Sequence, residues 1–144
     1  MNELEFTINK CTIEQIHQHL STVDEQFVPP LNSYVDIKTY SQKIGEYATR
    51  FEIQSSGILV GLIAAYFNED SSYVSNFTIE QNLTGKGAAQ QLLSFFERYC
   101  IDKKCQNILL EVFKTNTRAI NFYTKNKFYI KTEKVHQFVL EKKI

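Results

Sequence analysis

The chain has 144 residues with 16 basic and 16 acidic side chains, so its formal net charge at pH 7 is zero. Its 43% of hydrophobic residues suits one globular domain over residues 1–144, large enough to build a core without disulfides or a metal. Zero net charge argues against a protein that binds a nucleic-acid backbone, and the longest apolar stretch, 58–67, is too short to span a membrane.

The charges are unevenly distributed along the chain. Residues 1–101 carry 6 basic and 12 acidic groups, whereas residues 102–144 carry 10 and 4. A basic C-terminal third fits a compact polyanion, a second subunit, nucleic acid or a solvated lysine surface. Aromatic and basic residues interleave little outside 122–131, so we expect no nucleic-acid partner.

The cysteines and histidines do not form a metal-binding pattern. Cys11, Cys100 and Cys105 have no Cys-x-x-Cys spacing, so we expect free thiols and no metal. His17 and His19 lie two positions apart on a predicted helix and are expected to meet solvent. The start of the chain lacks the basic segment of a signal peptide, which favours a cytoplasmic protein with no membrane association.

The first half of the chain predicts three strands and two helices. Alternating residues indicate a strand at 4–9, and Thr12 with Gln15 forms a capping box for a helix to about residue 22. Asp36 is a cap for a second helix through Tyr47. Strands at 50–54 and 58–67 are joined by Ser-Ser-Gly, which predicts a hairpin.

The second half predicts four strands and two helices. The strands are expected at 73–80, 107–113, 128–132 and 135–140, and the helices at 87–101 and from Thr115 or Asn116 to about Lys125. A strand, a helix and a buried strand in succession imply a right-handed parallel crossover. We therefore expect an α/β sandwich: a mixed sheet of six to seven strands flanked by about four helices.

The most informative stretch is the glycine-rich loop Thr84-Gly85-Lys86-Gly87-Ala88-Ala89. It joins a predicted strand to a predicted helix, whose first N–H groups have no intrahelical partner and whose dipole attracts anions. A P-loop would need glycine at position 80 and Ser or Thr after the lysine, but the chain has Glu80 and Gly87. A dinucleotide fingerprint would need glycine where Gln90 stands.

The loop resembles instead the Gln/Arg-x-x-Gly-x-Gly/Ala motif of the GNAT superfamily of acyl-CoA-dependent N-acetyltransferases, with Thr84 departing at the first position. The run from Leu110 through Asn116, Phe122 and Tyr123 to Phe128 resembles the second acyl-CoA motif of the family, with Lys127 where many members have glycine. Because the order of elements also agrees over nearly the whole chain, the resemblance implies a GNAT-like fold.

The resemblance implies a site for acetyl-CoA. Its cofactor-binding residues would be Phe77, Ile79, Thr84, Gly85, Lys86, Gly87, Ala88, Ala89, Asn116 and Phe122. The backbone of Phe77 and Ile79 would pair with pantetheine as an added strand, and an N–H near Ile79 would face the thioester oxygen. Simpler roles stay open: Asn116 as a helix cap alone, and Lys86 as a solvated loop residue.

The expected reaction is direct attack of an amine on acetyl-CoA in a ternary complex, with the Tyr123 hydroxyl protonating the leaving thiolate. The simpler role for Tyr123 is a core tyrosine. Tyr34 and Glu80 are candidate acceptor contacts, although a solvent-facing carboxylate is the simpler role for Glu80. The acceptor is a small-molecule or peptide amine, and a homodimer through the late strand 135–140 is a further expectation of the resemblance.

Two alternatives from other classes stay open. Since Thr84 removes a long donor beside the pyrophosphate, the chain could be a GNAT-fold module that binds acyl-CoA or a protein without efficient transfer. A plain α/β interaction domain would require both motifs to be coincidental.

Overall fold

A computed structural model of the chain describes residues 3–27 and 29–144. One mixed sheet runs through these residues in the strand order β1-β2-β3-β4-β5-β7-β6. The strands are β1 (Leu4–Ile8), β2 (Thr49–Ser55), β3 (Ile58–Asn68), β4 (Ser71–Ile79), β5 (Asn107–Phe113), β6 (Tyr129–Glu133) and β7 (Gln137–Lys143). Among the described strands only the β4–β5 pairing is parallel, so the predicted mixed α/β sandwich is confirmed.

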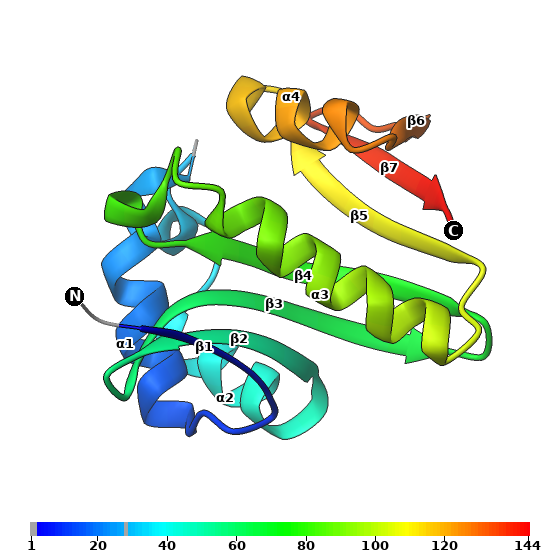
Figure 1. Ribbon diagram of the computed structural model, residues 1–144. Coiled ribbons are helices and arrows are strands. Elements are labelled where there is room, and N and C mark those ends of the chain that lie inside the picture. The colour runs from blue at the N-terminus through cyan, green and yellow to red at the C-terminus, as the bar shows by residue number, and fades with distance from the viewer. Residues whose placement is uncertain (1–2, 28) are drawn as a thin grey trace.

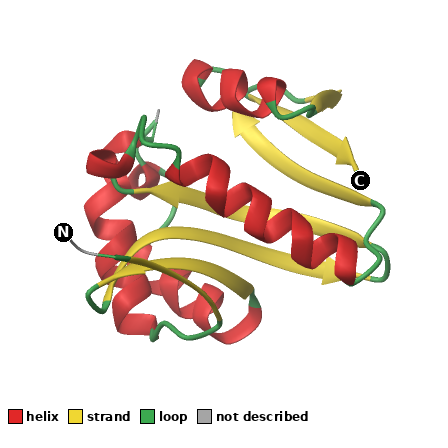
Figure 2. Ribbon diagram, viewed as in Figure 1, coloured by secondary structure: helices red, strands yellow, loops and turns green. Residues whose placement is uncertain are grey.

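Four α-helices cover the two faces of the sheet in the described part of the chain. They are α1 (Ile13–Val23), α2 (Ile37–Tyr47), α3 (Ala88–Asp102) and α4 (Thr117–Lys125). Figures 1 and 2 show α3 and α4 in front of the sheet and α1 and α2 behind it. Short 3₁₀ helices at Asp24–Gln26, Leu31–Ser33 and Gln81–Leu83, which the sequence did not predict, form the connections around the site.

The predicted helix starts are confirmed by the observed caps. The Thr12 side chain accepts from the Gln15 N–H while the Gln15 side chain accepts from the Thr12 N–H, which completes the capping box of α1. Asp36 caps α2 through the Thr39 N–H. Of the two candidates for α4, the cap is Asn116, which accepts from the Ala119 N–H at 3.2 Å.

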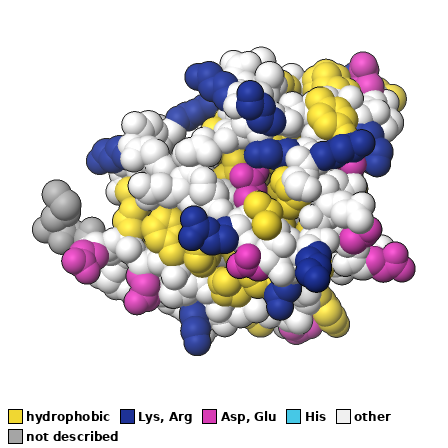
Figure 3. All heavy atoms as spheres, turned by 45° about the vertical axis from the view of Figure 1, so that its right-hand side comes forward, with side chains coloured by type: hydrophobic (Ala, Val, Ile, Leu, Met, Phe, Trp, Pro, Cys, Tyr) yellow, Lys and Arg dark blue, Asp and Glu magenta, His cyan; other side chains and the backbone are white. Residues whose placement is uncertain are grey.

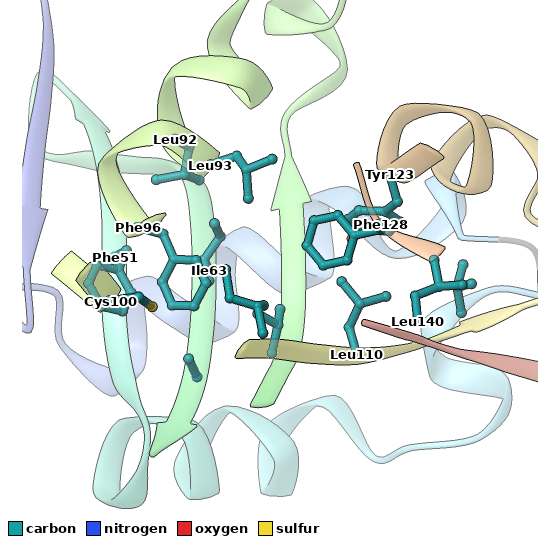
Figure 4. Close-up of a cluster of buried hydrophobic side chains, with 14 of the residues drawn as sticks. Phe51, Ile63, Leu92, Leu93, Phe96, Cys100, Leu110, Tyr123, Phe128 and Leu140 are labelled. Carbon is teal, nitrogen blue, oxygen red and sulfur yellow. The ribbon is translucent and has the colours of Figure 1, made fainter. Parts of the chain in front are cut away.

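The core is divided by the sheet. Under α1 and α2, Ile16, Leu20 and Ile44 pack on β3. On the other face Leu92 and Phe96 of α3 pack on Phe51 of β2, and the rings of Phe51 and Phe96 lie 4.9 Å apart. Figure 4 shows this second cluster spreading past β4 to a group beneath α4 made of Leu110, Tyr123, Phe128 and Leu140.

The expected exposure of His19 is wrong. Its side chain is 1% exposed, and Nε2 lies 2.7 Å from the Thr78 hydroxyl. The physical reason is its position on α1 between Ile16 and Val23, on the face that packs against the sheet. Burial lowers the pKa of His19 to about 4, so the ring is neutral in the folded protein near pH 7.

The last strand begins and ends later than the sequence predicts. Val135 is 81% exposed in the turn before β7, and β7 continues to Lys143 because that residue pairs with Asn107 of β5. Since β7 lies between β5 and β6, both of its edges are already paired. The expectation of a homodimer through this strand therefore has no support from its place in the sheet, whose edge on this side is β6.

Candidate functional site

The site begins where two parallel strands separate. The pairing of β4 with β5 runs only from Ser71↔Asn107 to Val74↔Leu110, although both strands continue beyond it. Figure 1 shows the two ribbons starting side by side and diverging toward the end of β4. Each strand keeps its outer neighbour, since β4 stays paired with β3 and β5 with β7. The sheet is therefore continuous at one end and split at the other.

The split leaves part of the β4 backbone facing the opening. The Glu80 N–H donates to the Val60 carbonyl of β3 at 2.9 Å, and peptide groups alternate in direction along a strand. The peptide groups of Phe77 and Ile79 are consequently turned toward β5, beyond the last β4–β5 pair. A bulge at Ser75, between the pairs Ala65↔Val74 and Ala64↔Asn76, bends β4 just where the strands part.

A cavity of about 650 Å³ fills this split. It collects most of the residues that the sequence proposed for a site: Tyr34, Phe77, Ile79, Thr84, Gly85, Gly87, Ala89, Asn116, Phe122 and Tyr123. These come from the loop before α2, from β4, from the glycine loop and from α4, so segments far apart in the sequence converge on one space.

The glycine loop lies at one end of the cavity. Gly85 and Gly87 have φ of 81° and 83°, a left-handed backbone that favours glycine, and Gly87 is the N-cap of α3. The first intrahelical bond of α3 runs from the Gln91 N–H to the Gly87 carbonyl, so the N–H groups of residues 88–90 have no acceptor within the helix. This end of the cavity therefore presents donors and a helix dipole to an anion.

Three proposed residues lie outside the cavity lining. The Lys86 N–H donates to the Leu83 carbonyl at 3.3 Å, and its side chain is exposed. The Ala88 methyl group is buried in the core, which leaves only its backbone N–H for a ligand. Glu80 follows the end of β4 as the cap of a 3₁₀ helix, and partial burial raises the pKa of its carboxyl group. The position of Glu80 gives no support to an acceptor contact.

Tyr123 projects from α4 into an aromatic environment beside β4. Its ring lies 6.1 Å from Phe77, 5.6 Å from Phe122 and 5.3 Å from Phe128, each in edge-to-face geometry. The side chain is 8% exposed and lines the cavity. Burial raises the pKa of the phenol above its ordinary value, so the hydroxyl keeps its proton at neutral and moderately alkaline pH.

The turn after α4 forms with Lys127 at the position where the second acyl-CoA motif often has glycine. The Phe128 N–H donates to the Tyr123 carbonyl and the Lys127 N–H to the Thr124 carbonyl, which is the bonding of a Schellman motif. Lys127 has φ of 75°, the left-handed conformation that glycine adopts most easily. The turn therefore forms with lysine, at a conformational cost that glycine would not have.

Sequence reasoning missed several cavity residues. Arg118 lies in the first turn of α4, where a basic residue opposes the helix dipole, and that mismatch is the signal that could have found it. Gln26 donates to the Ile79 carbonyl at 3.0 Å and accepts from the Gln81 N–H at 3.2 Å when its amide is oriented to satisfy both. Only the tertiary structure brings Gln26 to the end of β4.

The other end of the cavity carries tyrosines and a carboxylate, and Tyr34 and Tyr40 among them lie in the segment 27–47 that the sequence suggested for the acceptor site. The Tyr40 hydroxyl donates to the Ser75 carbonyl at the bulge at 3.0 Å, and the Tyr73 hydroxyl donates to Glu111 at 3.1 Å. Burial, with the nearby Tyr40 and Asp24, raises the pKa of Tyr34 to about 12. Burial and Glu111 likewise raise the pKa of Tyr73 to about 12.

The surface charges and the side chains outside the cavity give little indication of a second site. Figure 3 shows the Lys and Arg side chains of one face in separate groups with acidic side chains among them. Among the described residues no three His, Cys, Asp or Glu side chains gather closely enough to hold a metal ion, and no helix is long and apolar enough to cross a membrane. Cys11, Cys100 and Cys105 are buried free thiols.

Comparisons with known proteins agree with this geometry. The profile of the acetyltransferase (GNAT) family matches residues 13–128. The chain therefore belongs to the GNAT family of acetyltransferases. Among curated proteins none matches the chain.

Solved structures show how widely the fold is shared. PaiA N-acetyltransferase from Thermoplasma acidophilum in complex with coenzyme A has a TM-score of 0.77 at 17% identity, over 97% of this chain and 99% of that one. PH1933 from Pyrococcus horikoshii scores 0.83 at 18% identity over 99% of each chain. The ribosomal-protein-S18-alanine N-acetyltransferase from Escherichia coli scores 0.76 at 16% identity, over 100% of this chain and 94% of that one.

Proposed function

We propose that this protein transfers the acetyl group of acetyl-CoA to a primary amine by direct attack in a ternary complex. The observation that carries the proposal is the split between β4 and β5, where β4 peptide groups, the glycine loop and Tyr123 all border one cavity. Acetyl-CoA supplies the activated acetyl group as a thioester.

The cavity fits an extended anionic thioester. The free N–H groups at the start of α3 and the Arg118 guanidinium suit a pyrophosphate. The peptide groups of Phe77 and Ile79 suit the amides of a pantetheine arm, which would lie where β5 would otherwise continue the ladder. Asn116 and Phe122 border the same path.

Each proposed step uses a residue of the chain. An N–H of β4 near Ile79 donates to the thioester oxygen as negative charge develops there. The amine nitrogen forms its bond to the acetyl carbon while the carbon–sulfur bond breaks, and the Tyr123 hydroxyl gives its proton to the thiolate. The proton of the amine leaves through water at the tyrosine-lined end of the cavity, and the Tyr123 phenolate regains its proton from solvent.

A thermal-shift comparison of acetyl-CoA, CoA, ATP and NAD tests the cofactor. A ligand at about 100 times its Kd adds roughly 2.7 kcal/mol, or roughly 5 to 10 °C for a chain of this size. We expect shifts with both CoA species and none with ATP or NAD, followed by release of free CoA when amines are added. A CoA shift without transfer to any amine would favour a binding module, and no CoA shift would overturn the proposal.

A further inference from the structure

The two ends of the cavity differ in charge. Among the described residues that line it, only Arg118 and Glu111 have charged side chains. Arg118 belongs to the end formed by α4 and the glycine loop. Glu111 lies on β5 between Leu110 and Val112, whose side chains enter the core under α3 and α4, so the carboxylate is on the opposite face. A positive group thus borders the proposed cofactor path, and a negative group borders the acceptor end.

Three tyrosines from different elements surround this acidic end. The Tyr73 hydroxyl donates to Glu111 Oε2 at 3.1 Å. Tyr40 of α2 is held at the β4 bulge by its bond to the Ser75 carbonyl. The Tyr34 ring packs edge-to-face on Phe113 at 5.1 Å, and Phe113 is two residues from Glu111 on the same face of β5. Aromatic rings beside a carboxylate favour an organic cation, because the carboxylate and the ring faces both attract positive charge.

One cation already occupies the solvent side of this carboxylate. The Lys134 ammonium lies 2.7 Å from Glu111 Oε1, on the turn between β6 and β7. Its side chain is 53% exposed and does not line the cavity. Exposed ion pairs of this kind are weak, so a ligand ammonium can replace Lys134 at little cost. The pair shows that this carboxylate accepts an ammonium at hydrogen-bond distance.

We propose that Glu111, with Tyr34, Tyr40 and Tyr73, binds a second cationic group of the acceptor. The acceptor is then an amine that carries a positive charge in addition to the nitrogen that is acetylated. The reacting nitrogen itself fits this position poorly, because a neighbouring carboxylate would keep it protonated and without a nucleophilic lone pair. This inference rests on the proposed acetyl transfer and specifies its substrate class.

Three probes that differ only in the charge of one end test the proposal: 1,5-diaminopentane, 5-amino-1-pentanol and 5-aminopentanoate. With saturating acetyl-CoA, we expect kcat/KM for the diamine to exceed that for the amino alcohol by about tenfold, and the anionic probe to be the poorest. For any probe that is not turned over, the Kd for the CoA-saturated protein is measured by calorimetry, and the same order is expected.

Two variants should change the ratio of kcat/KM for the diamine to kcat/KM for the amino alcohol in opposite directions. Glu111→Gln keeps an acceptor for Tyr73 but removes the charge, so the advantage of the diamine over the amino alcohol should disappear. Lys134→Met leaves the carboxylate without its internal partner, so the same advantage should grow. Glu133→Gln and Lys114→Met are matched controls, since this pair is joined at 2.6 Å and lies outside the cavity lining.

The possible results distinguish failure of the cation site from failure of the proposed acetyl transfer. The cation site would be overturned if the wild-type protein had the same kcat/KM for the diamine and the amino alcohol. It would also be overturned if Glu111→Gln kept the wild-type ratio of these two values. Either result would leave the proposed acetyl transfer standing. Absence of any CoA shift in the wild-type protein would instead remove the acetyltransferase proposal. A CoA shift that survives in all four variants shows that they fold.

Discussion

At the scale of single residues, Tyr123 is a nearly buried side chain that also lines the cavity. Three aromatic rings surround it, and burial raises the pKa of its phenol. A phenol in this state keeps its proton, which the proposed transfer to a thiolate requires. Because Tyr123 also lines the cavity, its position supports the proposed role of general acid, which burial among aromatic rings alone would not do.

The first prediction concerns Tyr123→Phe. Removing the hydroxyl should lower kcat roughly 10²-fold or more, because a positioned acid contributes at least that much, while the Kd for CoA stays unchanged. The measurement is steady-state CoA release beside calorimetric CoA binding. Tyr99→Phe, which removes a hydroxyl from a tyrosine packed on Phe51, is the control and should keep full activity.

The pH profile adds a second readout to this variant. Since a general acid works in its protonated form and burial raises this pKa, the wild-type rate should not fall from loss of the Tyr123 proton below about pH 10. Full turnover by Tyr123→Phe at every pH would rule out the proposed acid.

At the scale of elements, the start of α3 combines two separate requirements. Gly85 and Gly87 adopt the left-handed backbone that the turn needs, and the helix that follows directs its free N–H groups into the cavity. A Cβ built on Gly87 meets nothing within 4 Å. The protein by itself therefore has room for a side chain at position 87. Apart from the left-handed backbone, only a bound ligand would require glycine there.

The second prediction compares Gly87→Ala with Gly57→Ala. Gly57, in the β2–β3 hairpin, has φ of 79° and equally open surroundings. Both variants should lose a similar amount of stability, about 1–2 kcal/mol, from the left-handed conformation. Only Gly87→Ala should weaken CoA binding, by tenfold or more. Stability is read from urea unfolding and affinity from calorimetry, and equal CoA affinity in the two variants would contradict the proposed phosphate contact.

A second element-scale feature is the clamp that joins β1, α1 and β2. The Glu52 side chain is fully buried and accepts from the Thr7 hydroxyl and from the N–H groups of Lys10 and Cys11. Arg50 Nε lies 3.4 Å from the same carboxylate. The segment that leads into α1 is therefore fixed to the sheet by one side chain.

The third prediction is that Glu52→Ala destabilises the fold by about 3–5 kcal/mol, because it leaves the buried Arg50 charge and two backbone donors without their acceptor. Urea unfolding measures the loss. Glu133→Ala removes a carboxylate from an exposed ion pair and should cost less than about 1 kcal/mol. Equal losses in the two variants would show that the clamp adds nothing beyond an exposed pair.

At the scale of the whole molecule, the packing of α1 on the sheet buries His19, and this burial makes the stability of the fold depend on pH in the acid range. Its hydrogen bond to Thr78 continues to Asn76, and both of these residues line the cavity. The pKa of His19 falls from 6.5 to about 4 on folding, mainly because burial disfavours the charged ring. The neutral ring therefore adds to stability above pH 6.5, and this part is lost as the pH falls from 6.5 through 4.

The fourth prediction follows from this linkage. Between pH 7 and pH 4 the wild type should lose about 3 kcal/mol of unfolding free energy that His19→Gln does not lose, since each pKa unit corresponds to about 1.4 kcal/mol. Urea unfolding at several pH values measures both proteins, and His17→Gln serves as the control with the wild-type dependence. Parallel curves for wild type and His19→Gln would contradict a neutral buried His19.

The sequence by itself determined the features that depend on neighbours in the chain. Helix caps at Thr12, Asp36 and Asn116 act over three residues, so local patterns predict them. The order of strands and helices follows from hydrophobic periodicity for the same reason. Together with the two motifs, this local information predicted the fold, and most of the site residues that it proposed border the cavity.

The tertiary structure alone decided the features that depend on distant pairing. Burial of His19 depends on which face of α1 meets β4, and the place of Glu111 among Tyr34, Tyr40 and Tyr73 depends on where β5 leaves β4. The end of that pairing at Val74 and Leu110 is set by the β4 bulge and by the partners that each strand keeps on its other side. A split between strands 36 residues apart has no local signature, because the packing of the whole sheet determines it.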